Sequence, residues 1–378
     1  GTATSPVLFT ANTETPEPGY WQGVFLGFFD KGSILRHAYI EYAGQGVENW
    51  EGKARHGSLH VRADHAIMEH CTIRYSAGHG LELDEDNSEI TDCSFTGNGT
   101  SEDHYDIFGE LTSLARKIER CAFSENKLYP VALPPGAING MRDNIFRPGQ
   151  KIKVWCAWLG ENVTWPDQGV PYVVDSLDPA YINLIVAGAG TPVLTLSPGV
   201  TVEFTSGRTL FIGTLDEPGA IVAEGTLTQP ITLTSVAPGS GVYWGGLSFD
   251  HAADTSRSVV KRVNISYGGR GYLWHDWYCD GNINLYRSSP RIEECESHPS
   301  DQHGLSAYQS AALISRSRFH HNGAAGSGFD IYTDTSSNLG VYRNEFGEGQ
   351  LYALQLAVGA VANLRGNTFA AGRAVSIT

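Results

Sequence analysis

The chain has 378 residues, of which 44 are glycine, 17 are proline and only two are methionine. Its 26 basic and 41 acidic side chains give a net charge of −15, which argues against nucleic acid or an anionic membrane surface as a partner. A hydrophobic fraction of 41% is too high for a disordered chain, and no apolar run reaches the ~18 residues of a membrane-spanning helix.

A long internal repeat organises the chain. The run from Gly1 to Thr10 aligns with the run from Gly225 to Thr234, an offset of 224. The offset then stays between 223 and 225 at these matches: Tyr20-Trp21 with Tyr243-Trp244, Cys71 with Cys295, His79-Gly80-Leu81 with His303-Gly304-Leu305, and Asn98-Gly99 with Asn322-Gly323. We therefore expect copy one at 1–154, copy two at 225–378, and a connecting segment with the opening coils of the next unit at 155–224. Copy one is then truncated at its start and copy two at its end, as in a fragment of a longer array.

Within each copy, short apolar segments alternate with turns rich in Gly, Asn and Asp. In copy one they include Ala66-Ile67-Met68, Cys71-Thr72-Ile73 and Cys93-Ser94-Phe95. One turn of three short strands cannot bury its inward side chains alone, whereas coils stacked ~4.8 Å apart form parallel ladders around a filled interior. The pattern predicts an all-β solenoid with very little helix, in which residues 155–190 are the least regular part.

Four segments carry a family resemblance. The runs 195–204, 219–226, 230–235 and 244–247 resemble the opening of the right-handed parallel β-helix repeat proteins of bacterial and archaeal cell surfaces, which share the architecture of pectate lyases. Later Asn-x-Phe and Gly-Leu-x-Leu steps are similar to the generic repeat of that fold. The resemblance implies a right-handed parallel β-helix with three faces and about 15–16 coils, located outside the cell or on its surface.

The six cysteines show no CxxC or His-spaced zinc pattern. Cys71 and Cys93 are 22 residues apart and can occupy equivalent places on adjacent coils, where the Cα separation suits a disulfide. The alternative is a ladder of buried free thiols.

Gly78-His79-Gly80 resembles one element of the polygalacturonase family, but the other three motifs of that family are missing from this sequence. Inverting hydrolysis would then lack its two carboxylates. Because His303-Gly304 occupies the same place in copy two, His79 is also explained as a turn histidine that each coil needs to fold. No cofactor is expected unless it is calcium.

Calcium could bind at Asp84-Glu85-Asp86, because it prefers oxygen ligands. A calcium-dependent lyase would also need a basic residue, for which Arg74, His79 or Arg62 is a candidate. The alternative is a solvated acidic turn.

An aromatic loop in copy two, Tyr272 to Asp280, has no close match in copy one. Trp274, Trp277 and Tyr278 could stack on sugar rings while Asp276 bonds hydroxyl groups. The alternative is a packed cover over one corner of the solenoid. The pair His320-His321, where copy one has Thr96-Gly97, is interpreted as a solvent-facing turn.

Two functions fit these patterns. The first is a structural or adhesive β-solenoid, part of a longer array or filament, whose partners are neighbouring units end to end and a polysaccharide. The second is a lyase or hydrolase acting on an acidic glycan, or a carbohydrate-binding module. The Asp-Pro-His-Glu element of the epimerase family is absent. An enzyme would need carboxylates and a base that converge in a groove.

Overall fold

The computed structural model describes residues 1–378 apart from 28, 30–31, 49–53, 63–64, 86, 125–126, 272 and 275–276. Its elements are short strands and two 3₁₀ turns, η1 (Ala137–Gly140) and η2 (Val358–Asn363). The chain divides into two compact units. Unit 1 holds residues 1–155 and 168–172, and unit 2 holds residues 156–167 and 173–378. Among the described residues, no helix has the length and apolar character needed to cross a membrane.

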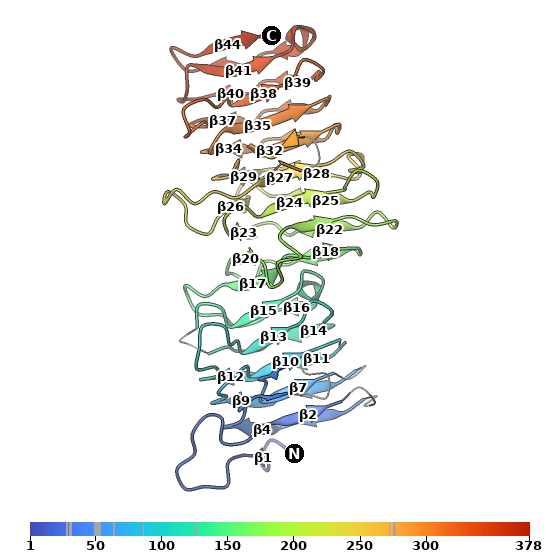
Figure 1. The fold of residues 1–378 in the computed structure, drawn as a ribbon, viewed down its shortest axis with the longest axis vertical. Coiled ribbons are helices and arrows are strands. Elements are labelled where there is room, and N and C mark those ends of the chain that lie inside the picture. Colours follow the sequence, from blue (N-terminus) through green and yellow to red (C-terminus); the bar gives the residue numbers. More distant parts are fainter. Residues whose placement is uncertain are drawn as a thin grey trace. The chain divides into compact units, whose positions relative to one another are not determined.

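Unit 1 is built from three parallel sheets whose strands stack in successive coils (Figure 1). Sheet 1a contains, in spatial order, β1 (Val7–Phe9), β4 (Ala38–Glu41), β9 (Thr72–Arg74) and β12 (Ser94–Thr96). Sheet 1b contains β2 (Val24–Leu26), β7 (Leu59–Val61), β10 (Leu81–Leu83), β13 (Ile107–Gly109), β15 (Val131–Leu133) and β17 (Ile152–Trp155). Sheet 1c contains β3 (Ile34–Arg36), β8 (Ile67–Glu69), β11 (Glu89–Thr91), β14 (Lys117–Glu119) and β16 (Met141–Arg142).

Unit 2 repeats this three-sheet plan. Sheet 2a contains β18 (Trp158–Leu159), β21 (Leu184–Val186), β24 (Thr209–Ile212), β27 (Gly246–Phe249), β32 (Gly281–Tyr286), β35 (His303–Tyr308), β38 (Ile331–Thr333), β41 (Tyr352–Leu356) and β44 (Ala374–Ile377). Sheet 2b contains β19 (Val163–Trp165), β22 (Val193–Leu196), β25 (Ala220–Glu224), β28 (Val259–Lys261), β33 (Arg291–Glu293), β36 (Leu313–Ser315), β39 (Gly340–Tyr342) and β42 (Leu364–Arg365). Sheet 2c contains β20 (Tyr172–Asp175), β23 (Thr201–Phe204), β26 (Ile231–Ser235), β29 (Val263–Ile265), β34 (Glu296–Ser297), β37 (Arg318–Phe319), β40 (Glu345–Phe346) and β43 (Thr368–Phe369).

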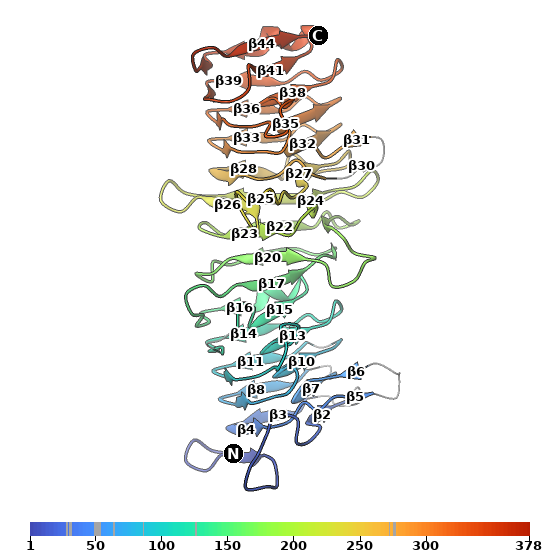
Figure 2. The same cartoon turned by 60° about the vertical axis from the view of Figure 1, so that its left-hand side comes forward.

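Each unit also carries one antiparallel hairpin outside its sheets. In unit 1 this is β5 (Val47–Glu48) with β6 (Ala54–Arg55), and in unit 2 it is β30 (Leu273–Trp274) with β31 (Trp277–Tyr278). Figure 2 shows each hairpin at the edge of its unit.

The core follows from the alternation of side chains along each strand. Leu59, Leu81 and Ile107 are register partners on adjacent strands of sheet 1b, and each is fully buried. Because neighbouring side chains of a strand point to opposite faces, the outward row of the same sheet is Phe25, His60, Glu82, Phe108, Ala132 and Lys153. Burial of inward rows in every coil supplies the main stabilising term of such a solenoid.

The predicted all-β solenoid of parallel strands is confirmed, whereas the tandem duplication stays a prediction, and the structure adds detail at the corners. The longest sheet has six described strands in unit 1 and nine in unit 2, consistent with the about 15–16 coils expected. Single-residue corners are often not glycine or asparagine: His70, Asp92 and Arg120 have φ of 53°, 54° and 52°. Residues 155–190, expected to be irregular, contain four strands, β18 to β21.

Candidate functional site

A groove in unit 1 runs past the outer side of β12 and encloses about 1020 Å³. Its lining residues come from four segments far apart in the sequence, because parallel coils bring one corner of each turn to the same place. The side chains that the following argument uses are Tyr75, Asn98, His104, Lys127, Tyr129, Arg147 and Lys153.

Asn98 fixes the turn that forms one wall of the groove. Its buried amide nitrogen donates to Ile73 O at 3.0 Å and to Asp106 Oδ1 at 2.9 Å, and its Oδ1 accepts from the Ser76 N–H at 3.2 Å. Asp106 in turn accepts from the backbone N–H and the hydroxyl of Ser124, both at 2.8 Å. A fully satisfied buried network of this kind holds the wall in one conformation.

The cationic side chains of the groove are held by aromatic rings and backbone oxygens. The Lys127 ammonium donates to His104 O at 2.7 Å, and burial lowers its pKa against the opposing charge of Asp106. The Lys153 ammonium lies 4.7 Å from the centre of the Tyr129 ring and 5.6 Å from that of Trp155. Such cation–π contacts hold the charged end of a side chain in place.

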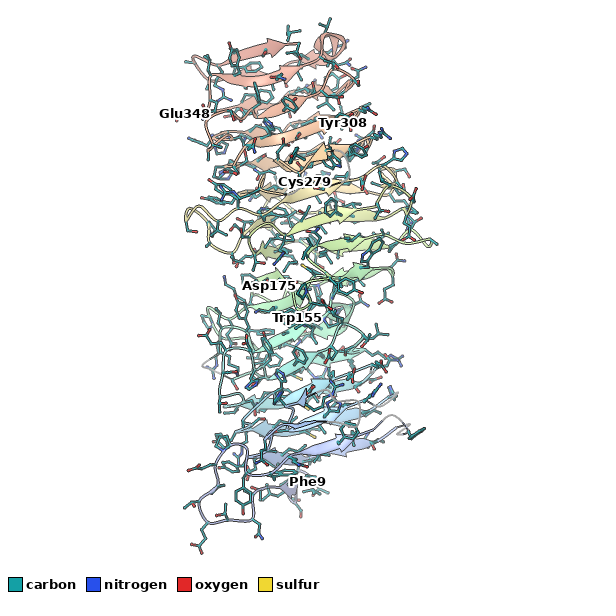
Figure 3. All side chains as sticks on the ribbon, viewed as in Figure 1. Phe9, Trp155, Asp175, Cys279, Tyr308 and Glu348 are labelled. Atoms are coloured by element: carbon teal, nitrogen blue, oxygen red, sulfur yellow. The ribbon has the colours of Figure 1, made fainter. Side chains whose placement is uncertain are left out.

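The rings below Lys153 form a packed platform. Tyr105, Phe108, Ala132 and Trp155 make one buried cluster, against which Tyr129 packs. The Trp155 side chain, labelled in Figure 3, donates its indole N–H to Gly109 O at 3.1 Å. On the other side of the groove, the Tyr75 ring stacks on Tyr42 at 5.2 Å between centroids.

His79, a candidate catalytic residue, is a buried packing residue. Its Nδ1 accepts the Tyr105 N–H at 3.0 Å and its ring stacks on Phe108 at 4.5 Å, while burial lowers its pKa to about 3. His303 makes the same contacts in unit 2, accepting the Phe329 N–H at 3.1 Å. Repetition of the contact favours the alternative of a turn histidine, since a neutral ring with its lone pair engaged is a poor base.

Arg74, the other candidate, is held at the corner after β9. Its guanidinium pairs with Glu41 at 2.6 Å and lies 5.4 Å from the centre of the Tyr75 ring. Its charge is therefore matched within the coil stack, which is not the arrangement of a proton-abstracting arginine.

The acidic turn has arginine partners rather than the open oxygen ligands that calcium needs. Asp84 is buried and accepts from Arg55 Nη2 at 2.6 Å, and Glu85 pairs with Arg62 at 3.2 Å. Asp86 lies outside the described residues. Because the guanidinium groups already supply the positive charge, the two described carboxylates form a structural ion-pair cluster, and the calcium prediction finds no support there.

Arg55 is the centre of that cluster, which the sequence did not reveal. Its Nη1 donates to Glu82 Oε1 at 3.1 Å and to Glu110 Oε1 at 3.0 Å. The other oxygen of Glu82 accepts the backbone N–H groups of His56 and Gly57, both at 2.9 Å. Burial raises the pKa of Glu82, but His60, His79 and the His56 N–H outweigh it and hold the pKa at about 2. The pattern Leu81-Glu82-Leu83 is typical of a strand whose Glu faces solvent. In the structure, β6 covers Glu82.

The predicted carbohydrate loop divides into a packed part and an exposed part. Trp277 is only 5% exposed and packs with Ile185, Phe211, Cys279 and Tyr286, of which Figure 3 labels Cys279. Tyr278, its neighbour, is 62% exposed. Asp276 and the side chain of Trp274 lie outside the described residues. Trp277 thus fits the alternative of a packed cover, and it is unable to stack on a sugar.

All six cysteines are buried free thiols, including Cys71 and Cys93. Cys93 Sγ donates to Met68 O and Thr91 O, so its thiol has backbone partners instead of a sulfur bond. The structure therefore contains the buried thiol ladder, and the disulfide between Cys71 and Cys93 is not formed in it. The neighbouring Cys121 thiol and burial raise the pKa of Cys93 to about 12, against the opposing effect of the Cys71 thiol.

One group of side chains has the composition of a metal site. Glu296, His298 and His320 in unit 2 bring their ligand atoms within 4.8 Å of one another. The sequence singled out His320 with His321 as a turn pair but gave no reason to join it to Glu296 and His298. What brings the three residues together is that His298 and His320 occupy equivalent places on adjacent coils. This equivalence follows from the strand register, which the sequence alone does not give.

The comparisons with known proteins agree with this architecture. Residues 249–378 match the family model described as a right-handed β-helix region. The chain has the fold of a parallel β-helix. No curated protein and no solved structure matches this chain.

Proposed function

We propose that this β-helix is an adhesive or structural solenoid at the cell surface or outside the cell, and that the groove of unit 1 binds an acidic polysaccharide. The observation that carries the proposal is the set of groove cations, Lys127, Arg147 and Lys153, beside the rings of Tyr75 and Tyr129. Aromatic rings stack on the apolar faces of sugars, and cations bind uronate carboxylates.

Charge supports an acidic ligand. The chain carries a net charge of −15, so cations gathered in one groove stand out against an acidic background that would repel the ligand elsewhere. Glu102 and Asp103 also line the groove and are exposed. Their charge favours a glycan with spaced carboxylates over a densely sulfated chain. A dense polyanion would place its negative groups beside both Glu102 and Asp103, which would repel it.

Strand edges support the end-to-end association of coils. All three residues of β1 are exposed, including Leu8 at 55%, and Ile377 of β44 is 54% exposed. An apolar strand with an open edge pairs readily with a further coil, either of the same array or of another copy. Negative-stain electron microscopy tests this part: fibres with a regular axial repeat support it, and dispersed single rods contradict it.

Binding is tested by calorimetric titration of the full chain with oligogalacturonate and with a neutral oligoglucan of equal length. We expect binding of the acidic chain only, weakened by salt. Lys153→Ala should weaken it about tenfold, as expected for loss of one charge-assisted contact. Lys261→Ala, which removes a half-buried lysine paired with Glu224 in unit 2, is the matched control.

Two outcomes would overturn the binding proposal. The first is equal affinity for the neutral and acidic chains, and the second is equal affinity of Lys153→Ala and Lys261→Ala. Shortening of the polysaccharide during incubation, read by reducing-end or unsaturated-sugar formation, would instead favour the enzyme alternative.

A further inference from the structure

Two histidines and a glutamate meet on adjacent coils of sheet 2c. Glu296 lies on β34 and His298 follows it, so the two share one side of the strand. His320 follows β37, the neighbouring strand, in which Arg318 is the register partner of Glu296. The backbone ladder continues through them: His298 N–H donates to Ile265 O, and His320 N–H to Ser297 O.

The distances between their ligand atoms are close to those of a coordination sphere. His320 Nε2 lies 2.9 Å from Glu296 Oε1, and His298 Nε2 lies 3.9 Å from Glu296 Oε2. The two rings are stacked with centroids 4.3 Å apart. With metal–nitrogen bonds of about 2.0–2.1 Å, ligands of a tetrahedral Zn²⁺ stand about 3.3 Å apart. The three ligand atoms already lie within 4.8 Å of one another, so rotation of the stacked rings and a closer approach of the side chains would bring them onto one ion.

A second histidine contacts the outer nitrogen of His320. The Nδ1 atom of His320 lies 2.7 Å from His321 Nδ1, a hydrogen bond that requires one proton between the two rings and that either ring can donate. When His321 donates it, His320 Nε2–H donates to Glu296 Oε1 at 2.9 Å; when His320 donates it, its Nε2 lone pair is available to a metal ion. A ligating histidine commonly donates its other N–H to such an outer partner.

Two further charged residues lie near the cluster. Arg318 competes with a metal ion for Glu296, and Glu348 contacts His321. Arg318 Nη1 lies 3.4 Å from Glu296 Oε1, but its Nε pairs with Glu345 at 3.2 Å, and the side chain is half exposed. It can stay with Glu345 when a metal binds Glu296. Glu348, labelled at the left edge of the ribbon in Figure 3, lies 3.9 Å from His321 Nε2 and stabilises the outer partner.

The same place in copy one lacks every ligand. At the offset of 224, Thr72, Arg74 and Thr96 stand where copy two has Glu296, His298 and His320, and Gly97 stands for His321. A solenoid coil therefore folds without these groups, since unit 1 forms the corresponding strands β9 and β12. Folding alone does not explain a carboxylate and two imidazoles converging here.

We propose that Glu296, His298 and His320 bind one divalent transition-metal ion of the Zn²⁺ type, and that His321 orients His320. Two imidazoles and one carboxylate suit Zn²⁺ or Co²⁺ and do not suit Ca²⁺ or Mg²⁺, which prefer oxygen ligands. Three protein ligands leave the fourth position of the metal to water or to a ligand. The metal would also tie β34 to β37.

The test is a calorimetric titration of the full 378-residue chain, freed of metal by chelation, with Zn²⁺ and separately with Ca²⁺. We expect one Zn²⁺ site per chain, no Ca²⁺ binding at this site, and a visible spectrum of low-symmetry Co²⁺ when Co²⁺ replaces zinc. His320→Ala and Glu296→Gln should each weaken Zn²⁺ binding more than tenfold. His321→Ala should weaken it about 10–100-fold, as for an outer partner of a ligand.

His251→Ala is the matched control, because His251 is an exposed histidine of unit 2 outside the cluster. Circular dichroism reports whether each variant is folded, and Glu296→Gln carries the test if His320→Ala is not, since it keeps the side-chain shape. The proposal is overturned if the folded parent chain binds no Zn²⁺. It is also overturned if Glu296→Gln and His251→Ala bind Zn²⁺ equally well.

Discussion

Replacing Glu82 tests whether the buried ion-pair cluster holds the β6 segment onto sheet 1b. Glu82 is 3% exposed, and its carboxylate accepts the N–H groups of His56 and Gly57 as well as Arg55 Nη1. Glu82→Gln keeps the size of the side chain but removes the charge and places an NH₂ group against one of these donors. Buried donors then lose a partner.

The magnitude follows from the pKa of Glu82. Its fall from 4.5 to about 2 corresponds to about 3 kcal/mol of stability at neutral pH, at 1.36 kcal/mol per unit. Since the folded pKa is below the unfolded one, this stability is present above pH ~4.5 and is lost as the pH falls toward ~2. For a unit of this size it amounts to a fall in Tm of about 6–12 °C.

Thermal unfolding by circular dichroism, at neutral pH and near pH 3, measures the effect. Glu82→Gln should lower Tm at neutral pH. It should also make the difference between the Tm at neutral pH and the Tm near pH 3 smaller than in the parent chain. Hydrogen exchange should show faster exchange of the His56 and Gly57 amides. Glu89→Gln is the control, because the ion pairs of Glu89 with described residues are long contacts of 4.0 Å to His65 and Arg116. Equal Tm and equal amide exchange in the two variants would refute the reasoning.

Three further predictions concern other buried groups. The six cysteines should resist a thiol reagent at pH 8 until the chain is unfolded, because their buried side chains are out of reach of the reagent; rapid labelling of the native chain would contradict this. Trp277→Ala should destabilise unit 2 by about 3–5 kcal/mol in urea, whereas Tyr278→Ala should change it by less than about 0.5 kcal/mol. Burial raises the pKa of Asp330 to about 6, with Asn322 and Arg373 opposing, so the stability associated with its protonated form is lost as pH rises from ~4 through ~6. Arg373→Met should therefore cost about 3–5 kcal/mol at pH 8 and little at pH 4, and an equal loss at both would count against it.

The architecture could be read from the sequence because it depends on local pattern. Each inward residue of a coil meets the same kind of residue in the next, so spacing alone indicates that Cys71 and Cys93 occupy equivalent places on adjacent coils. The structure shows the same stacking for Phe95 and Phe123. The match of His79 with His303 likewise pointed to a packing role, since a contact made in both copies is needed by the coil itself.

The sites could not be read in this way, because they depend on outward side chains that different coils bring together. A Glu between two leucines of a strand is expected to face solvent. Nothing in Leu81-Glu82-Leu83 indicates that Arg55 will contact Glu82. Trp277 lies in a loop that suits sugar binding by composition, and only packing against Tyr286 shows that it is buried.

The sequence by itself therefore determined the parallel β-helix, its three faces and the identity of its core, since inward burial recurs in every coil and leaves a periodic signal. The tertiary structure alone decided which outward groups meet: Lys153 above Tyr129, Arg55 among three carboxylates, and Glu296 beside His298 and His320. The physical reason is that register between neighbouring strands sets these contacts, and contacts between residues 24, 27 or 55 positions apart have no fixed period in the sequence.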